Sequence, residues 1–178
     1  MEEKTNQSPL MVDTMSSSSS AVNPDPLTRV CSLLNKHGVR YMVVGGHACI
    51  LHGLVRTTED IDILVEESED NYRRIITALS EMEDGAAREL TPRDFQDNLV
   101  VKVADEVEVD ISRRAWKVAY IDARDSVCYA EIDGVRIPYA DLKTLITSKE
   151  TYREQDRADL LRLRALARIV KPSPQNKE

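Results

Sequence analysis

A short apolar segment that ends in two glycines restricts the fold more than any other feature of this chain. Residues 41–44 are almost entirely apolar, which is typical of a strand buried on both faces of a sheet. Gly45-Gly46 ends this segment, and helical spacing follows over residues 47–54. Residues 59–65 first alternate polar and apolar and then run apolar, which predicts another strand. We therefore expect a strand, a glycine turn, a short helix and a second strand in direct succession.

The rest of the chain continues this mixture of helices and strands. A helix is predicted to begin at Pro26 and to stop at His37-Gly38. Asp133-Gly134 marks a type I′ hairpin turn. The further expected elements are a helix over 69–82, strands over 99–103, 107–111, 127–132 and 135–138, and helices over 141–149 and 156–170. This order predicts an α+β domain, in which helices cover a mixed sheet and a helical pair closes the chain.

The length and composition are those of one domain with two unstructured ends. The chain has 178 residues, of which 42% are hydrophobic and 31% charged, so it contains enough apolar side chains for one packed core. Residues 1–23 include five consecutive serines and few large apolar side chains, and residues 171–178 contain two prolines. We expect both ends to be disordered and the domain to span residues 24–170.

The charge balance and the cysteines exclude several classes of protein. The formal net charge is −7, which argues against broad, sequence-independent binding of DNA. No apolar run approaches the roughly 20 residues that a membrane span needs, and no signal peptide is recognisable. The three cysteines lack metal-ligand spacing. We expect a cytoplasmic protein without membrane contact.

Two acidic strand segments suggest a metal site. Asp60 and Asp62 lie two residues apart on a strand, so their side chains share one face about 6.6–7 Å apart along the chain. Glu108 and Asp110 repeat this pattern on a later strand. By itself, such alternation also fits a half-buried strand with one wet face. Like charges that face each other across a sheet are unfavourable, however, and neither segment contains a lysine or arginine. A divalent cation such as Mg²⁺ could neutralise the carboxylates.

The glycine pair adds a candidate anion site. Glycine permits positive φ and the close approach of another group to the backbone. A helix that starts after Gly45-Gly46 would present unpaired N–H groups, which suit a phosphate. The acidic strand follows this helix directly, so phosphate and metal would lie side by side. Together these features indicate phosphoryl-type chemistry on a nucleotide.

The same segments resemble a known superfamily. Val43-Val44-Gly45-Gly46, Asp60-Ile61-Asp62-Ile63 and Val109-Asp110-Ile111 resemble the motifs of the nucleotidyltransferases of the DNA polymerase β type. The run GGHACILHGLVRTTEDIDILV is similar to the bacterial branch that is related to abortive-infection nucleotidyltransferase toxins, as is the later stretch from Leu145 to Leu160. The resemblance covers about residues 26–166.

The resemblance implies a metal-dependent catalytic centre. Asp60 and Asp62 would bind Mg²⁺ or Mn²⁺. Asp110 would complete the metal site and help to activate the attacking hydroxyl, with Glu108 as its substitute or support. The reaction would be in-line attack of an acceptor hydroxyl on the α-phosphate of an NTP such as ATP, which releases pyrophosphate. The acceptor would be an RNA, for example a tRNA, or a protein.

The resemblance also implies where the nucleotide binds. Gly45 and Gly46 would hold the triphosphate. Arg56 and Lys149 are candidate phosphate contacts, although each is equally well explained as a solvated surface base. A catalytically silent nucleotide-binding protein, which regulates a cognate toxin or antitoxin, is the alternative function. An enzyme that modifies a small molecule such as an aminoglycoside ranks lower, because no sizeable second domain is present to shape its pocket.

Three further groups of residues have a less specific sequence signal. The arginines at 153, 157, 162, 164 and 168 form either a solvated helix face or a basic edge for an RNA acceptor. His47 and His52 are five residues apart, which does not align them as a metal-binding pair on a helix. Trp116 is expected to pack in the core or between subdomains.

Overall fold

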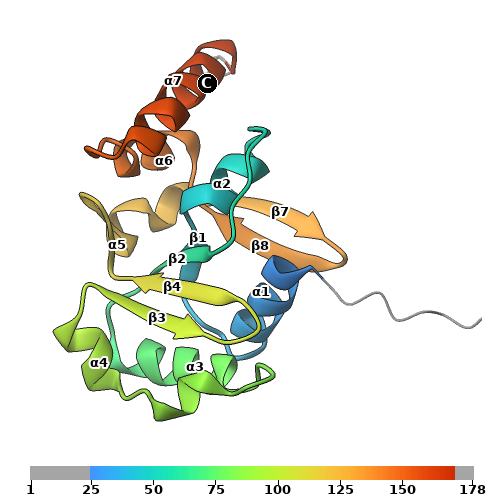
Figure 1. Cartoon of the computed structure of the whole chain (residues 1–178), viewed down its shortest axis with the longest axis vertical. Coiled ribbons are helices and arrows are strands. Elements are labelled where there is room, and N and C mark those ends of the chain that lie inside the picture. Colours follow the sequence, from blue (N-terminus) through green and yellow to red (C-terminus); the bar gives the residue numbers. More distant parts are fainter. Residues whose placement is uncertain (1–24, 171–178) are drawn as a thin grey trace, which may run out of the picture.

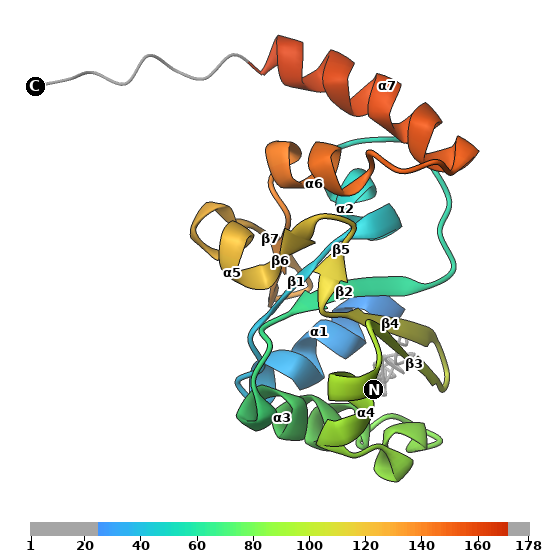
Figure 2. The same cartoon turned by 90° about the vertical axis from the view of Figure 1, so that its left-hand side faces the viewer.

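The computed structural model describes residues 25–170, so the disorder expected for 1–23 and 171–178 lies outside the described residues. The chain forms seven helices and eight strands over this range (Figures 1 and 2). In order they are α1 (Pro26–Lys36), β1 (Tyr41–Val43), α2 (Gly45–Leu51), β2 (Ile61–Val65), α3 (Glu69–Leu79), α4 (Pro92–Asp97), β3 (Val100–Ala104), β4 (Glu108–Ser112), β5 (Arg114–Ala115), β6 (Val118–Ala119), α5 (Tyr120–Ala123), β7 (Cys128–Ile132), β8 (Val135–Tyr139), α6 (Leu142–Ser148) and α7 (Glu154–Ile169).

Six of the strands form one mixed sheet in the order β3-β4-β2-β1-β8-β7. The neighbours β2 and β4 are parallel, as are β1 and β8, whereas the pairs β1–β2, β3–β4 and β7–β8 are antiparallel. The two acidic strands β2 and β4 are therefore adjacent, although more than 40 residues separate them in the sequence. The expected α+β class with a mixed sheet and a C-terminal helical pair is confirmed (Figure 1).

Capping side chains define the helices that pack against the sheet. Asp25 caps α1 because its side chain accepts a hydrogen bond from the Thr28 N–H. Ser68 caps α3 because its hydroxyl oxygen accepts a hydrogen bond from the Asn71 N–H. The buried amide of Asn71 also hydrogen-bonds both backbone groups of Arg40, and it donates to the carbonyl oxygen of Glu66. Arg40 directly precedes β1 and Glu66 directly follows β2, so these hydrogen bonds fix the start of α3 to the central strands.

The core fills the space between the sheet and the pair of helices α1 and α3, which pack against each other. Ile61, Ile63 and Ile111 point into this core and are almost completely buried. Helix α2 contacts β2 and α6, and α6 in turn contacts α7, so α7 lies at the far end of the molecule from α3 (Figure 2). No helix among residues 25–170 is long and apolar enough to cross a membrane.

The structure differs from the sequence expectations at the short elements. Helix α2 begins at Gly45 itself, so the glycine pair belongs to the first turn of the helix. Helices α4 and α5 and the two-residue strands β5 and β6 are not predicted from the sequence. Of the two alternatives for Trp116, packing in the core is wrong: the residue lies in the turn between β5 and β6, is 42% exposed, and contacts the ring of Tyr152 from the loop between α6 and α7. A turn of two residues leaves its side chains at the surface.

Candidate active site

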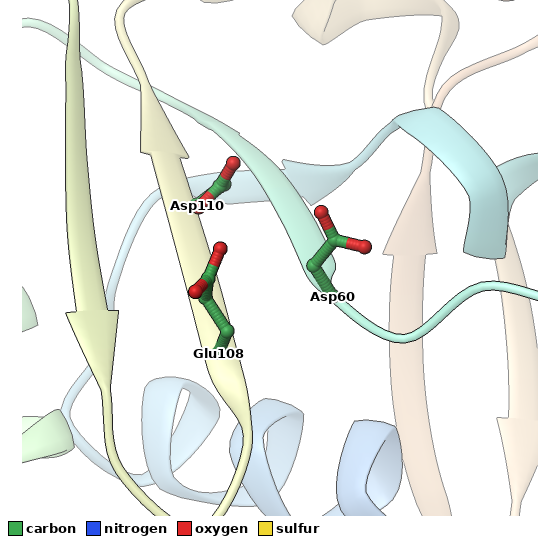
Figure 3. Close-up of side chains that lie close together, drawn as sticks. All are labelled: Asp60, Glu108 and Asp110. Carbon is green, nitrogen blue, oxygen red and sulfur yellow. The ribbon is translucent and has the colours of Figure 1, made fainter.

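Parallel pairing of β2 with β4 brings the predicted acidic residues together. In this register Asp62 is opposite Asp110, and Asp60 directly precedes β2. One carboxylate oxygen each of Asp60, Glu108 and Asp110 can be chosen such that all three lie within 4.8 Å of one another. Figure 3 shows these side chains between the two strands. Glu108 thus belongs to the cluster together with Asp110.

Asp62 lies against the glycine turn. A Cβ atom added to Gly45 would be 2.0 Å from Asp62 Oδ2, and the backbone of Gly45 has a φ of +60°. The Gly46 N–H donates a hydrogen bond to the Asp62 carboxylate. The absence of side chains on the turn is therefore what lets Asp62 fit beneath it. A Cβ on Gly46 would in turn meet Thr58 Oγ1 at 2.4 Å.

The acidic surroundings favour the protonated form of Asp62. Burial raises the pKa of this carboxyl group, and the negative charges of Asp60 and Asp110 raise it further. Lys149 and the Gly46 hydrogen bond act in the opposite direction but do not outweigh these effects. A cation placed among the carboxylates would relieve the repulsion.

A lysine on the neighbouring strand supplies part of the missing positive charge. Lys102 on β3 is paired with Asp110, and its Nζ lies 2.9 Å from Asp110 Oδ1 and 2.5 Å from Glu108 Oε1. The hydrogen bond to Glu108 and the nearby carboxylate of Asp110 raise the pKa of Lys102. This contact is not predicted from the sequence, because neither acidic segment contains a basic residue and the lysine comes from a third strand. The alternation of Lys102 with buried Val101 and Val103 is the signal that could have revealed it.

The carboxylates fit a hard divalent cation. All candidate ligand atoms are carboxylate oxygens, which Mg²⁺ and Mn²⁺ prefer. Asp110 Oδ1 is buried and has no hydrogen-bond partner within residues 25–170, because the Lys102 ammonium is near it but not in hydrogen-bonding geometry. A buried carboxylate oxygen without a partner is costly, and a metal ion would satisfy it.

The acidic cluster opens into a cavity of about 350 Å³. Its wall combines carboxylates, cations and hydroxyl groups from β2, β4, the loop before β2, and the start of α7. The lining residues are Gly46, Arg56, Thr57, Thr58, Glu59, Asp60, Asp62, Asp110, Lys149, Arg153, Gln155 and Asp156. The site residues expected from the sequence therefore line one cavity, except Gly45, which lies behind Asp62, and Glu108, which is not among the lining residues.

Arg56 and Lys149 are not solvated surface bases. Arg56 Nη1 lies 2.5 Å from Asp159 Oδ2, and both side chains are at most 10% exposed. Lys149 Nζ lies 2.8 Å from Asp156 Oδ1 and 3.2 Å from Asp159 Oδ2. The four residues form a buried ionic cluster that joins the loop before β2, the end of α6 and helix α7.

The charges of this ionic cluster stabilise one another. Burial alone would lower the pKa of Lys149, but the hydrogen bond and the charge of Asp156 outweigh it, so the pKa is raised. Burial alone would raise the pKa of Asp156, but hydrogen bonds from Lys149 and Thr151 outweigh it, so the pKa is lowered. Both groups therefore stay charged around neutral pH.

The histidines have structural contacts instead of metal-binding geometry. The ring Nδ1 of His47 lies 3.1 Å from the carbonyl oxygen of Asp60, which links α2 to the start of β2. The ring Nε2 of His52 lies 2.8 Å from the carbonyl oxygen of Ala140. Each imidazole thus ties helix α2 to a neighbouring segment.

A second cavity, of about 410 Å³, lies at the opposite end of β2. Its two acids are already neutralised, because Glu66 pairs with Arg40 and Glu67 pairs with Arg113. It lacks the three converging carboxylates of the first cavity, which is therefore the better candidate for a reaction centre.

Comparison with known proteins yields matches in structure but none in sequence. No protein-family model and no curated protein matches the chain. An antigenic nucleotidyltransferase-like protein from Paracoccidioides brasiliensis is similar with a TM-score of 0.55 at 13% identity, over 84% of this chain and 77% of that one. A candidate nucleotidyltransferase from Thermotoga maritima is similar with a TM-score of 0.50 at 18% identity, over 76% of this chain and 88% of that one. The chain therefore has the fold of nucleotidyltransferase-like proteins.

Proposed function

We propose that this protein is a metal-dependent nucleotidyltransferase that moves an NMP from an NTP to an acceptor hydroxyl and releases pyrophosphate. The observation that carries the proposal is the cluster of Asp60, Glu108 and Asp110, whose oxygens lie within 4.8 Å of one another. This cluster adjoins a cavity of about 350 Å³ that also bears Arg56 and Lys149. Carboxylates and cations in one cavity suit a metal–triphosphate complex.

The acids would divide the work between metal binding and proton transfer. Asp60, Asp110 and Glu108 would hold Mg²⁺ or Mn²⁺, and Asp62 would join them from the glycine side. The bound cation would neutralise negative charge that develops on the α-phosphate. Asp110 would also help to activate the attacking hydroxyl, because its carboxylate lines the cavity beside the acids that would hold the cation.

The basic side of the cavity would position the triphosphate. Arg153 lines the cavity and forms no ion pair within residues 25–170, so it is available to a phosphate. Arg56 and Lys149 would each bind a phosphate oxygen while they remain paired with α7. Gly46 would contribute its backbone to the same wall. Positioning by such groups, and not covalent chemistry, would supply most of the rate.

The acceptor would be an RNA or a protein, and the nucleotide would be ATP or another NTP.

A second candidate function is a catalytically silent nucleotide-binding regulator in a toxin–antitoxin pair. One observation favours it: the Lys102 ammonium lies 2.9 Å from Asp110 Oδ1 and 2.5 Å from Glu108 Oε1, where it competes with a cation for the same carboxylates.

A labelling experiment distinguishes the two functions. The protein is incubated with each α-labelled NTP, with Mg²⁺ or Mn²⁺, and with tRNA and cell protein, and the labelled product is separated. We expect transfer that Asp60→Asn and Asp110→Asn abolish while the far-UV CD spectrum and Tm stay those of a folded protein. The control Asp97→Asn changes an exposed acid on α4 and should retain activity.

A wild-type protein that transfers no label would decide against the enzyme. If the wild type transfers no label with any NTP, the enzymatic proposal is wrong. A rise in Tm with NTP and metal in that same protein would instead support the nucleotide-binding regulator.

A further inference from the structure

Two aromatic rings form an exposed corner close to the candidate active site. The centroids of Trp116 and Tyr152 are 5.9 Å apart, and the ring planes meet at 87°. Trp116 is 42% exposed and Tyr152 is 85% exposed. They come from separate segments, the β5–β6 turn and the loop between α6 and α7. Neither ring is needed to fill the core, so their placement at the surface calls for another explanation.

The backbone of Trp116 is held in an unfavourable conformation. Its φ is +58°, a region that large side chains rarely adopt and that glycine or asparagine would enter more easily. Strained backbone of this kind is concentrated at functional sites. The turn therefore keeps a tryptophan where a smaller residue would be more stable.

The aromatic corner adjoins the cavity that holds the acidic cluster. Tyr152 directly precedes Arg153, which lines that cavity together with Asp60 and Asp110. Strand β5 contacts β2, and β6 contacts α6, so the hairpin that carries Trp116 lies between the acidic sheet and the C-terminal helices (Figure 2). A ligand bound in the cavity can thus extend toward the two rings.

Unpaired positive charges accompany the rings. Arg114 and Lys117 belong to the hairpin of Trp116, and Arg153 follows Tyr152. None of these three cations has an ion-pair partner in the part of the chain that the structure describes, although the chain as a whole carries a net charge of −7. Exposed aromatic rings and cations on the same segments are the features that bind the bases and phosphates of nucleotides.

We propose that Trp116 and Tyr152 form a nucleobase-stacking subsite of the active site. A flat base would stack on the face of one ring and meet the other at its edge, which the perpendicular arrangement of the rings permits. This inference rests on the proposed function, because it assigns one part of a bound nucleotide. The base belongs either to the NTP or to the end of an acceptor RNA, and the experiment separates these two sources.

The single tryptophan of the chain makes the subsite directly measurable. Trp116 fluorescence, excited at the red edge where nucleobases absorb little, is titrated with each NTP, with a short single-stranded RNA and with inorganic tripolyphosphate. We expect ligands that contain a base to quench the emission, whereas tripolyphosphate leaves it unchanged. Tyr152→Ala should lower the affinity of the ligand that quenches Trp116 about tenfold. Tyr152→Phe, which keeps an aromatic ring, should restore this affinity.

A matched control tests whether any exposed tyrosine has this effect. Tyr129 on β7 is 54% exposed and also lies beside a cation, with Arg136 at 3.7 Å from its ring centroid. Tyr129→Ala should leave the affinity unchanged.

Quenching by NTPs alone would assign the base to the nucleotide substrate, and quenching by RNA alone would assign it to the acceptor. Either result supports the subsite.

The inference and the proposed function fail in different ways. The subsite is excluded if no NTP and no RNA quenches Trp116, if tripolyphosphate quenches equally, or if Tyr152→Ala binds as tightly as the wild type. A wild type that is quenched but transfers no label would refute the catalytic proposal and leave the subsite standing.

Discussion

Lys102 and Asp110 face each other across β3 and β4, with Lys102 Nζ 2.9 Å from Asp110 Oδ1. The same ammonium lies 2.5 Å from Glu108 Oε1, so one lysine contacts two of the three clustered carboxylates. It offsets part of their repulsion in the absence of a metal. A divalent cation that binds the cluster must displace this ammonium or share the carboxylates with it.

We therefore expect Lys102→Met to tighten Mn²⁺ binding several-fold, because the competing charge is removed. Isothermal titration calorimetry with Mn²⁺ alone measures this affinity. Lys143→Met on α6 is the control, since that lysine is exposed and has no ion pair within residues 25–170. Weaker binding in Lys102→Met would show that the lysine orients the carboxylates and does not compete with the cation.

Asp62 is expected to destabilise the metal-free protein at neutral pH. Burial and the charges of Asp60 and Asp110 raise its pKa in the folded state above the ordinary value of 3.8. An acid with a raised folded-state pKa begins to cost stability as the pH rises above its unfolded-state pKa, and the full cost is reached above its folded-state pKa. It costs nothing when it is protonated in both states. The destabilisation is thus present at neutral pH and disappears as the pH falls toward 3.8.

Asp62→Asn should accordingly raise the Tm at pH 7 in EDTA, by roughly 2–4 °C for each kcal/mol of repulsion relieved. The gain should shrink steadily in acidic buffers. Thermal melts of both proteins across this pH range provide the measurement, with Asp97→Asn as an exposed control. A lower Tm for Asp62→Asn at every pH would mean that its hydrogen bond from Gly46 outweighs the repulsion.

The sequence predicts local structure well where a segment is long enough to have a period. The alternation around Asp62 and Asp110 identified both acidic strands, and the apolar run before Gly45 identified the buried strand. The register that puts Asp62 opposite Asp110 depends on the packing of the whole sheet. The same holds for Lys102, because it enters the site only through the β3–β4 pairing.

Short elements and ion pairs with distant partners explain what the sequence did not predict. Strands β5 and β6 have two residues each, so they have no recognisable alternation, and the sequence gives no sign that Trp116 lies in a surface turn. Arg56 and Lys149 were identified as candidate site residues, but their burial depends on Asp159, which lies 103 residues after Arg56. No pattern within a single segment indicates such a pairing.

The buried pair of Lys149 and Asp156 should be strongly coupled. Their side chains are 11% and 9% exposed, so removing one partner leaves a buried, unpaired charge. Lys149→Met should cost about 3 kcal/mol of unfolding free energy, whereas the double variant Lys149→Met/Asp156→Leu should recover most of it. Urea denaturation of the two single variants and the double variant measures the coupling. Additive losses in the double variant would show that the two charges act independently.

The exposed pair of Arg93 and Asp97 provides the comparison for this cycle. Its side chains are 83% and 62% exposed, and both lie on α4. Arg93→Met should change the unfolding free energy very little, because solvent screens a surface ion pair. If Arg93→Met lost as much unfolding free energy as Lys149→Met, burial would not be the cause of the loss in Lys149→Met.

Gly45 should be the least replaceable glycine of the chain's described part. It has a φ of +60°, and an added Cβ would lie 2.0 Å from Asp62 Oδ2, whose side chain is enclosed beneath the turn. Gly45→Ala combines backbone strain with this overlap, so we expect a loss of at least ~2–3 kcal/mol in unfolding free energy. Gly53→Ala is the matched control, because Gly53 has a φ of +90° but no atom within 4 Å of the added Cβ. Urea denaturation should show a smaller loss of unfolding free energy for Gly53→Ala, because only backbone strain contributes to it. Equal losses for the two variants would mean that the contact with Asp62 is not what requires glycine at this turn.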